Sequence, residues 1–382
     1  MTTLTDKENL WEDKLVKLDN YFRQFVEKLG YIDLKEGASY DLLGDLPLPI
    51  YLDDMKKGLV SGDMENKINL DLILQGMLIN IGADQDFLHN YEYINVLNHY
   101  IKDITSFSSS KAIEAMDYDY DKALLLLRGG YILNPMDRYN SYNYARLLWP
   151  MAYKEEIKEK EKDDFVREAL RILQEIITAN DDFAIAYYEL GNIYTNLGEY
   201  LKARNYYNNA LRRTDSETAK EEVREKLAEI NDNAEIEEAL YYIGKSNYNE
   251  AVMKLTGILS QRKRADAYYY LGVAYQNLAQ YENSIMAFQN GINEGADFRE
   301  AYNDYAISLY MNKEVEKALT VIQEGLKKYP EDPRLIYNKI QINLSLGNIK
   351  QAKDDIDNLL TYDDLTEEII TNLNILKNQF NI

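Results

Sequence analysis

The feature that most constrains this chain is a pattern of small and large residues that recurs every 34 residues along its C-terminal part. The pattern is clearest from Ala184. If Ala184 is position 1, small residues stand at position 8 (Gly191) and position 20 (Ala203), and large apolar residues surround them at helical spacing. Two helices can approach closely where small residues meet. One such hairpin leaves an apolar face uncovered, so successive hairpins must stack into an array.

The residues that carry this pattern match the signature positions of the tetratricopeptide repeat (TPR), and the chain resembles that family. In the clearest unit the matching residues are Tyr187, Leu190, Gly191, Tyr194, Gly198, Tyr200, Ala203, Tyr207 and Ala210. The resemblance implies an all-α fold, a TPR-type α-solenoid of about seven helical-hairpin units with a C-terminal capping helix, preceded by a small helical N-terminal domain. The expected boundaries are 1–103 for the N-terminal domain, 104–366 for the solenoid, with units starting near 104, 138, 184, 232, 265, 299 and 333, and 367–382 for the capping helix.

Two charged inserts interrupt the repeats. Residues 154–164 delay the second helix of the unit from 138, and residues 217–230 follow the clearest unit and predict an extended helix. At the C-terminus, apolar residues lie on one face of a predicted helix and Asn and Lys lie opposite, which is typical of a polar capping helix. The apolar residues are Ile369, Leu373, Leu376 and Phe380.

The first 103 residues do not match the repeat. A helix is predicted from Thr5 or Asp6 to Leu29, where Gly30 stops it. Its apolar residues alternate in spacings of four and three, which is a short heptad seam that either packs on its own domain or forms a homodimer. These residues are Trp11, Leu15, Leu18, Phe22, Phe25 and Leu29. Loops are expected over 30–66, and helices over 67–81 and 84–102.

Composition excludes several classes of function. The formal net charge is −22, so a nucleic acid or an anionic membrane is a poor partner. The chain has no cysteine, which removes thiolate chemistry and cysteine-ligated metals. Neither a signal peptide nor an apolar membrane span is recognised, so a cytoplasmic location is expected. Abundant Asn, Ile, Lys and Tyr suggest a low-GC bacterium.

No catalytic, cofactor-binding or metal-binding residues are predicted. Asp117–Asp121 resembles the opening of a calcium loop, but Lys122 and Arg128 occupy the places where an EF-hand needs Gly and Glu. The two histidines, His89 and His99, fall on different faces of a straight helix. Nucleotide-binding and hydrolase motifs are also missing, so the chain is expected to be a non-enzyme without cofactors.

The resemblance also implies where a partner would bind. In the repeat family, positions 2, 5, 9, 12 and 13 of the first helix of each unit line the concave surface and contact extended peptides or helices. Some co-chaperones of the family hold a C-terminal carboxylate with Lys at position 5, but here that position is Tyr188, so such a clamp is not expected. The contact residues predicted by the matching positions are Tyr188, Asn192, Thr195, Asn196, Asp266, Tyr269, Gln276, Asn277, Glu300, Asn303, Tyr310, Arg334, Tyr337 and Gln341.

The leading hypothesis is a scaffold or adaptor that binds a protein or peptide, with a neutral or basic segment in an acidic, Tyr-lined groove. A peptide-sensing regulator of the type found in low-GC bacteria is the alternative, with a small peptide in the same groove. An enzyme with an unrecognised site in residues 1–103 is a third reading, which predicts perturbed carboxylates in a deep pocket there.

Overall fold

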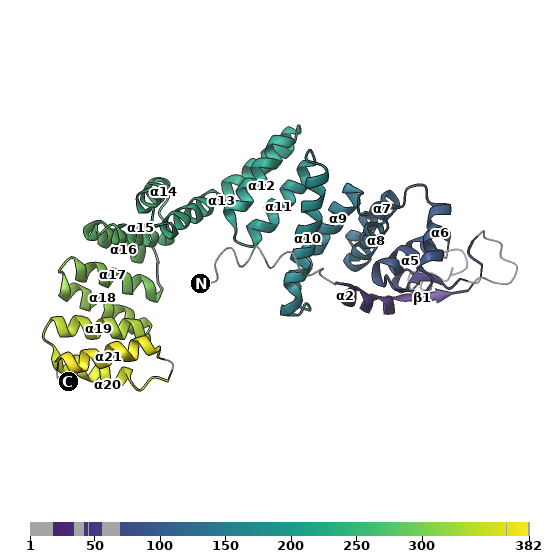
Figure 1. Cartoon of the computed structure of the whole chain (residues 1–382). Helices are drawn as coiled ribbons and strands as arrows, with labels where there is room; N and C mark the ends of the chain where they lie inside the picture. Colours follow the sequence, from purple (N-terminus) through teal and green to yellow (C-terminus); the bar gives the residue numbers. More distant parts are fainter. Residues whose placement is uncertain (1–17, 34–41, 45, 56–68, 364, 381–382) are drawn as a thin grey trace. The chain divides into compact units, whose positions relative to one another are not determined.

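The computed structural model describes residues 18–33, 42–44, 46–55, 69–363 and 365–380. The chain divides into two compact units, whose elements are labelled in Figure 1. Unit 1 comprises residues 1–198 and 202–227, and unit 2 comprises residues 199–201 and 228–382. No helix of the described residues is both long enough and apolar enough to span a bilayer.

Unit 1 contains the N-terminal segment and the first stacked hairpins. Its elements are α2 (Asp19–Arg23), the 3-10 helix η1 (Gln24–Lys28), β1 (Leu29–Ile32), β2 (Leu48–Tyr51), α5 (Leu70–Ala83), α6 (Asn90–Tyr100), α7 (Ile104–Met116), α8 (Tyr120–Leu133), α9 (Arg138–Leu148), the 3-10 helix η2 (Trp149–Tyr153), α10 (Glu159–Ala179), α11 (Ala184–Asn196), most of α12 (Tyr200–Arg213) and the first part of α13 (Glu217–Gly244).

Unit 2 contains the later hairpins and the C-terminal helix. Its elements are the later part of α13, α14 (Tyr248–Gln261), α15 (Ala265–Asn277), α16 (Tyr281–Asn293), α17 (Arg299–Met311), α18 (Val315–Lys328), α19 (Pro333–Ser345), α20 (Ile349–Leu359) and α21 (Glu367–Phe380). Leu373 of α21 is fully buried against α19 and α20, with Ile369, Leu376 and Phe380 packed beside it. The predicted apolar face of the capping helix is therefore confirmed.

Six helices begin at the residue where the repeat pattern starts a unit. They are α7, α9, α11, α15, α17 and α19. Aspartates fix three of these starts, because the side chains of Asp103, Asp137 and Asp332 accept hydrogen bonds from backbone N–H groups two or three residues later. The all-α repeat fold predicted from the sequence is confirmed in these hairpins.

Both charged inserts take the form expected from the sequence. After α9 the chain makes the 3-10 turn η2, and the second helix of that hairpin, α10, begins only at Glu159. The insert at 217–230 is helical and continues without a break into the unit predicted near 232. The result is α13, a single helix of 28 residues that carries residues of both compact units.

The N-terminal part departs from the prediction because it is not wholly helical. The helix expected to reach Leu29 ends at Arg23, passes into a 3-10 turn and becomes strand β1. β1 pairs antiparallel with β2, with Leu29 opposite Tyr51, and all four residues of β2 are buried. The pairing satisfies the backbone groups of each strand that face the other strand. The helices expected over 67–81 and 84–102 are present as α5 and α6.

The described residues of the apolar seam predicted in the first helix are buried within this chain. Leu18, Phe22, Phe25 and Leu29 are all buried. Trp11 and Leu15 lie outside the described residues. This burial favours packing of the seam on its own domain, and the homodimer stays a prediction.

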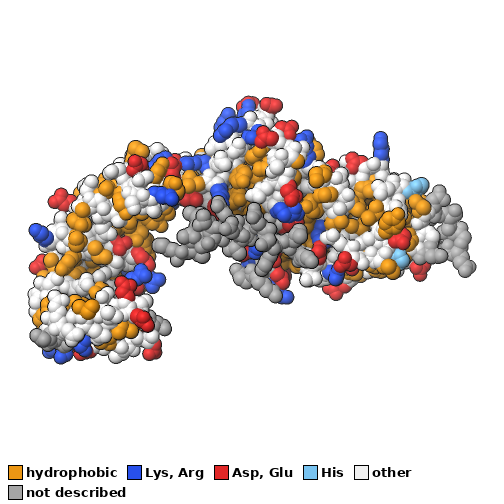
Figure 2. Space-filling view, viewed as in Figure 1, with side chains coloured by type: hydrophobic (Ala, Val, Ile, Leu, Met, Phe, Trp, Pro, Cys, Tyr) orange, Lys and Arg blue, Asp and Glu red, His pale blue; other side chains and the backbone are white. Residues whose placement is uncertain are grey.

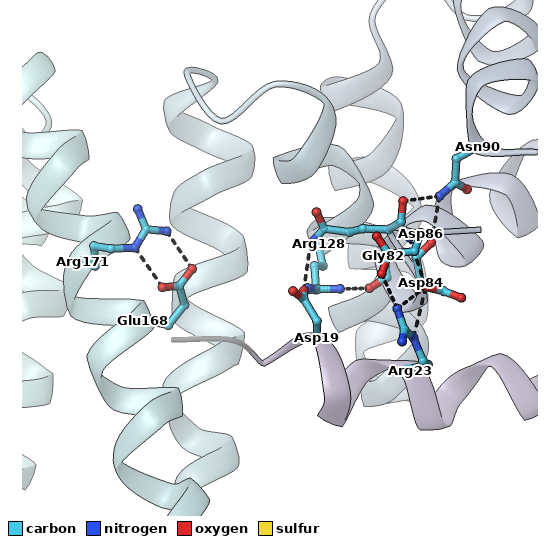
Figure 3. Close-up of polar contacts among 10 residues, drawn as sticks. Asp19, Arg23, Gly82, Asp84, Asp86, Asn90, Arg128, Glu168 and Arg171 are labelled. Carbon is cyan, nitrogen blue, oxygen red and sulfur yellow. Dashed lines mark hydrogen bonds and ion pairs between the residues drawn. The ribbon is translucent and has the colours of Figure 1, made fainter. Parts of the chain in front are cut away.

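The N-terminal segment is held on a close helix pair by ion pairs, one of which involves a buried arginine. β2 packs on α5, and α5 packs on α8. The buried Arg128 of α8 donates to the carbonyl of Gly82 and, at 2.5 Å, to Asp19 (Figure 3). Its guanidinium also lies 4.2 Å from the ring centre of Phe22. Nearby, Arg23 donates to Asp84 and Asp86 (Figure 3). The segment is therefore tied to α8 through Asp19 and to the residues after α5 through Arg23.

Candidate functional site

Three of the predicted contact residues connect one first helix to the next. The hydroxyl of Tyr188 donates to Glu222 at 2.6 Å, and the hydroxyl of Tyr269 donates to Asp304 at 2.8 Å. The carbonyl oxygen of the Asn303 side chain accepts from Asn338 at 2.5 Å. All three occupy position 5 of their unit, so the structure uses this position to tie neighbouring helices together.

Most of the other predicted contact residues also have partners within the chain. Asn196 and Asn277 donate to carbonyls one turn earlier in their own helices, and Thr195 donates to the carbonyl of Gly191. Further pairs join Gln276 to Ser308 and the Asp304 carbonyl, Tyr310 to Ser345, Gln341 to Tyr337, Asp266 to Arg264 and Glu300 to Arg299. Arg334 is exposed at the start of α19.

A groove between α17 and α19 brings two of the predicted residues together. Its cavity volume is about 250 Å³. The groove is lined by Ala306, Ile307, Tyr310, Met311, Asn338, Gln341 and Ile342. Tyr310 and Gln341 were predicted, and none of the seven side chains is charged. Tyr310 is 38% exposed and Met311 is 49% exposed, so both are available to a partner.

The sequence prediction missed five lining residues, although a signal for two of them was present. Ile307 stands at position 9 and Met311 at position 13 of the unit from 299, so the spacing alone nominates them. Ala306, Asn338 and Ile342 stand outside the five positions, and only the packing of α17 on α19 shows that they line the groove.

A half-buried carboxylate lies beside this groove. Asp304 accepts from the Tyr269 hydroxyl and, at 3.1 Å, from the Asn303 amide. Burial raises the pKa of Asp304, and the two hydrogen bonds oppose that rise in part. Burial also raises the pKa of Tyr269, helped by the negative charge of Asp304. The bond from Tyr269 holds α15 against α17.

In unit 1, the first-helix surface contains a buried carboxylate that the sequence prediction missed. Glu189 of α11 is 5% exposed and accepts from the Trp149 indole at 2.7 Å and from Asn192 at 3.2 Å. The other side of the Asn192 amide accepts from Tyr207 at 2.8 Å. Asn192, a predicted contact residue, is therefore held in place between two partners.

The titration of Glu189 gives a measurable pH dependence. Burial raises its pKa from 4.5, while the bonds from Trp149 and Asn192 oppose the rise. A carboxyl with a raised folded-state pKa keeps its proton to higher pH than in the unfolded chain. Its contribution to stability is therefore full below pH 4.5 and is lost as the pH rises through the folded-state pKa.

The fluorescence of Trp149 reports this titration, because its indole donates to Glu189. The chain has two tryptophans, Trp11 and Trp149, so replacing Trp11 isolates the signal of Trp149. In a Trp11→Phe background, we expect a pH titration of Trp149 fluorescence with a midpoint above 4.5. Glu189→Gln is expected to abolish the transition. A transition that persists in that variant would assign it to another group.

Among the described residues, no three His, Asp or Glu side chains are grouped so that they could hold a metal ion. In the calcium-like stretch, the side chain of Asp119 caps α8 by accepting from the backbone of Lys122 at 2.9 Å. On the face shown in Figure 2, acidic and basic side chains are interspersed.

Comparison with known proteins agrees with the repeat geometry. Residues 184–216 and residues 266–290 match tetratricopeptide repeat families. A 119-residue stretch is 31% identical to the photosystem I assembly protein Ycf3 of Prochlorococcus marinus, covering 28% of this chain and 66% of that protein. The chain contains tetratricopeptide repeats.

Other similarities to tetratricopeptide repeat proteins are shorter or more distant. A TPR repeat-containing protein of Pseudomonas aeruginosa is 38% identical over 66 residues, which is 15% of this chain and 11% of that protein. The chain thus spans slightly less than two thirds of Ycf3 and about a tenth of the Pseudomonas protein.

Two solved structures are similar to parts of this chain. YrrB, described as a TPR protein with an unusual peptide-binding site, is 18% identical with a TM-score of 0.37, covering 52% of this chain and 96% of YrrB. The type IV pilus biogenesis factor PilW is 17% identical with a TM-score of 0.40, covering 60% of this chain and 98% of PilW.

Proposed function

We propose that this tetratricopeptide repeat protein is a non-catalytic scaffold or adaptor that binds a segment of a partner protein. The observation that carries the proposal is the groove between α17 and α19. It combines exposed large side chains, Tyr310 and Met311, with two amides, Asn338 and Gln341. Binding surfaces favour this mixture, because apolar area supplies affinity and amides supply adaptable hydrogen bonds to a peptide backbone.

The dimensions of the groove support binding of an extended segment with one apolar anchor. A cavity of about 250 Å³ is below the usual size of a site for a whole small-molecule ligand. It can receive one large aliphatic or aromatic side chain. The residues on either side of that anchor would then lie along the exposed faces of α17 and α19.

The chemistry of the lining supports a neutral or basic partner segment. The seven lining side chains are uncharged, so a charged anchor would lose its hydration without gaining a partner. Over longer distances, the net charge of −22 attracts basic segments and repels acidic ones. A cytoplasmic location stays a prediction.

A charge placed in the groove tests the proposal. Short random peptides displayed on phage would be selected on the full chain, and the retained peptides measured by fluorescence anisotropy. We expect Met311→Glu to weaken their binding at least about tenfold, because the new carboxylate must be desolvated against the anchor.

Met286→Glu is the matched control. Met286 is 62% exposed on α16, a second helix, and it does not line the groove. Binding to this variant should equal binding to the wild type. If neither variant weakens binding, or if both weaken it equally, the groove is not the site. If no peptide is retained by the wild type, the binding function itself is wrong.

A further inference from the structure

We infer that unit 1 carries a small-molecule site on its second helices, which takes a neutral and mostly apolar ligand. The site is a cavity between the last turn of α8 and the C-terminal half of α10, bordered by the turn that leads from α8 into α9. It differs from the α17–α19 groove in its location and in the class of its occupant. It therefore goes beyond the function proposed above, and either site can exist without the other.

The volume of this cavity suits a whole small molecule. The cavity measures about 420 Å³. Sites for small ligands usually measure about 300–1,000 Å³, so this cavity lies within that range. The α17–α19 groove, at about 250 Å³, falls below it. A compact molecule of two or three rings can therefore be enclosed in unit 1 where the groove would hold a single side chain.

Direct contacts fix the two helices that form the walls of the cavity. The guanidinium of Arg171, in α10, donates to the hydroxyl of Tyr131, in α8, at 2.8 Å. The ring of Tyr131 stacks on the ring of Tyr144, in α9, with the two centroids 5.3 Å apart, and Tyr144 is buried. Because these contacts hold α8, α9 and α10 together, the cavity is formed before a ligand arrives. Binding therefore loses little free energy to ordering of the walls.

The lining of the cavity is mostly apolar. Ile172 and Ile176 of α10 line it and are only 1% and 5% exposed, so their surface faces the inner part of the cavity. Pro135 and Met136 border it from the turn between α8 and α9. Met136 is 82% exposed, and its flexible thioether side chain can adjust to the shape of a ligand. An apolar ligand would be stabilised by removing these surfaces and its own from water.

The charged side chains of the lining are already paired, which selects against a charged ligand. Arg171 donates to both carboxylate oxygens of Glu168, at 2.7 and 2.9 Å (Figure 3). It also donates to Glu175 at 2.6 Å. Arg138 donates to Asp182 at 3.3 Å. A charged ligand would have to separate one of these pairs or lose its hydration without gaining a partner.

Uncharged polar side chains at the edge of the cavity can orient a ligand. Gln174 and Thr178 line it and are exposed, and Asn180 follows the end of α10. Side-chain amides both donate and accept hydrogen bonds. They therefore suit a ligand with one hydroxyl, carbonyl or amine N–H group on an otherwise apolar body.

Two fluorescent probes that differ in charge test this site. N-Phenylnaphthylamine is neutral, and anilinonaphthalene sulfonate has the same rings with an added sulfonate. Both become brighter when they leave water. We expect the neutral probe to bind the full chain saturably, with one site per chain. The sulfonate should bind about tenfold more weakly, because its charge would lose hydration in the cavity.

Two variants alter the cavity at exposed residues, away from the core. Ala179 is exposed in the last turn of α10, and Ala179→Leu would fill part of the cavity with the larger side chain. We expect this variant to weaken binding of the neutral probe about tenfold. Met136→Ala removes apolar contact area from the other side and should weaken binding several-fold.

Ala228→Leu is the matched control. Ala228 is also an exposed alanine in a helix, but it belongs to α13 and does not line the cavity. This variant should bind the neutral probe as the wild type does. Met311→Glu, which alters the α17–α19 groove, should do the same. Circular dichroism would check that each variant is folded.

The inference is overturned if the wild type does not bind the neutral probe saturably, or if it binds the sulfonate as tightly. It is also overturned if folded Ala179→Leu and Met136→Ala bind like the wild type, or if either control weakens binding equally. Displacement of the probe by peptides selected on the full chain would overturn it too, because the cavity would then take a partner segment. Loss of peptide binding in Met311→Glu with the probe still bound would leave both proposals intact.

Discussion

Gly82→Ala is expected to destabilise unit 1 by about 3 kcal/mol, because an added methyl group has no space at this position. A Cβ built on Gly82 would lie 2.3 Å from the carbonyl oxygen of Leu125 in α8. The neighbour is backbone and cannot rotate away as a flexible side chain could. The opposing glycine, Gly129, is similarly close to the carbonyl of Leu78 in α5, so α5 and α8 cross at a contact that only glycine allows.

A second glycine provides the control for Gly82→Ala. A Cβ on Gly257, inside α14, would meet nothing within 4 Å. Gly257→Ala should therefore stabilise unit 2 by about 0.5–1 kcal/mol, the usual gain when alanine replaces glycine in a helix. Hydrogen exchange of the amides in α5, α8 and α14 would report each effect locally. If the amides of α5 and α8 exchange as slowly in the Gly82→Ala variant as in the wild type, these two helices can move apart at little cost in free energy.

Much of the repeat fold could be predicted because its determinants lie close together in the sequence. Gly191 and Ala203 are twelve residues apart, and the caps Asp103, Asp137 and Asp332 directly precede their helices. Six helices begin at residues 104, 138, 184, 265, 299 and 333, near which the repeat pattern predicts unit starts. Local information of this kind needs no knowledge of the rest of the chain.

The N-terminal part could not be predicted in the same way. Leu29 continues the heptad spacing of Phe22 and Phe25, so the local pattern favours helix. What makes β1 a strand is its pairing with β2, about twenty residues later, and the burial of β2 on α5. Tertiary contacts of this type override local propensity.

The candidate contact residues show a second limit of prediction from the sequence. Spacing places Tyr188, Tyr269 and Asn303 on the exposed stripe of a first helix, but it does not reveal whether each side chain faces solvent. Each of them bonds to a residue 34 or 35 positions later. A polar partner one repeat further along was therefore the signal that could have marked these residues as structural.

The buried ion pair between Lys122 and Asp54 yields the other large expected effect. The Lys122 ammonium lies 2.6 Å from the Asp54 carboxylate, and the two side chains are only 4% and 12% exposed. Asp54→Leu would leave a buried ammonium with no carboxylate, at a cost of about 3–5 kcal/mol. Faster hydrogen exchange of the backbone amides in β2 and in the first turn of α8 would reveal this loss of stability.

The double variant Asp54→Leu with Lys122→Met separates charge burial from loss of packing. Two apolar side chains of similar volume need no desolvated partner, so the double variant should recover most of the stability lost by either single change. If the double variant is instead as unstable as the sum of the two single changes, the two side chains contribute independently and the ion pair has no coupling energy. Recovery of stability in the double variant would mean that the ion pair mainly specifies where residues 46–55 dock on α8. Each of the two buried charges would then destabilise the protein only when its partner is missing.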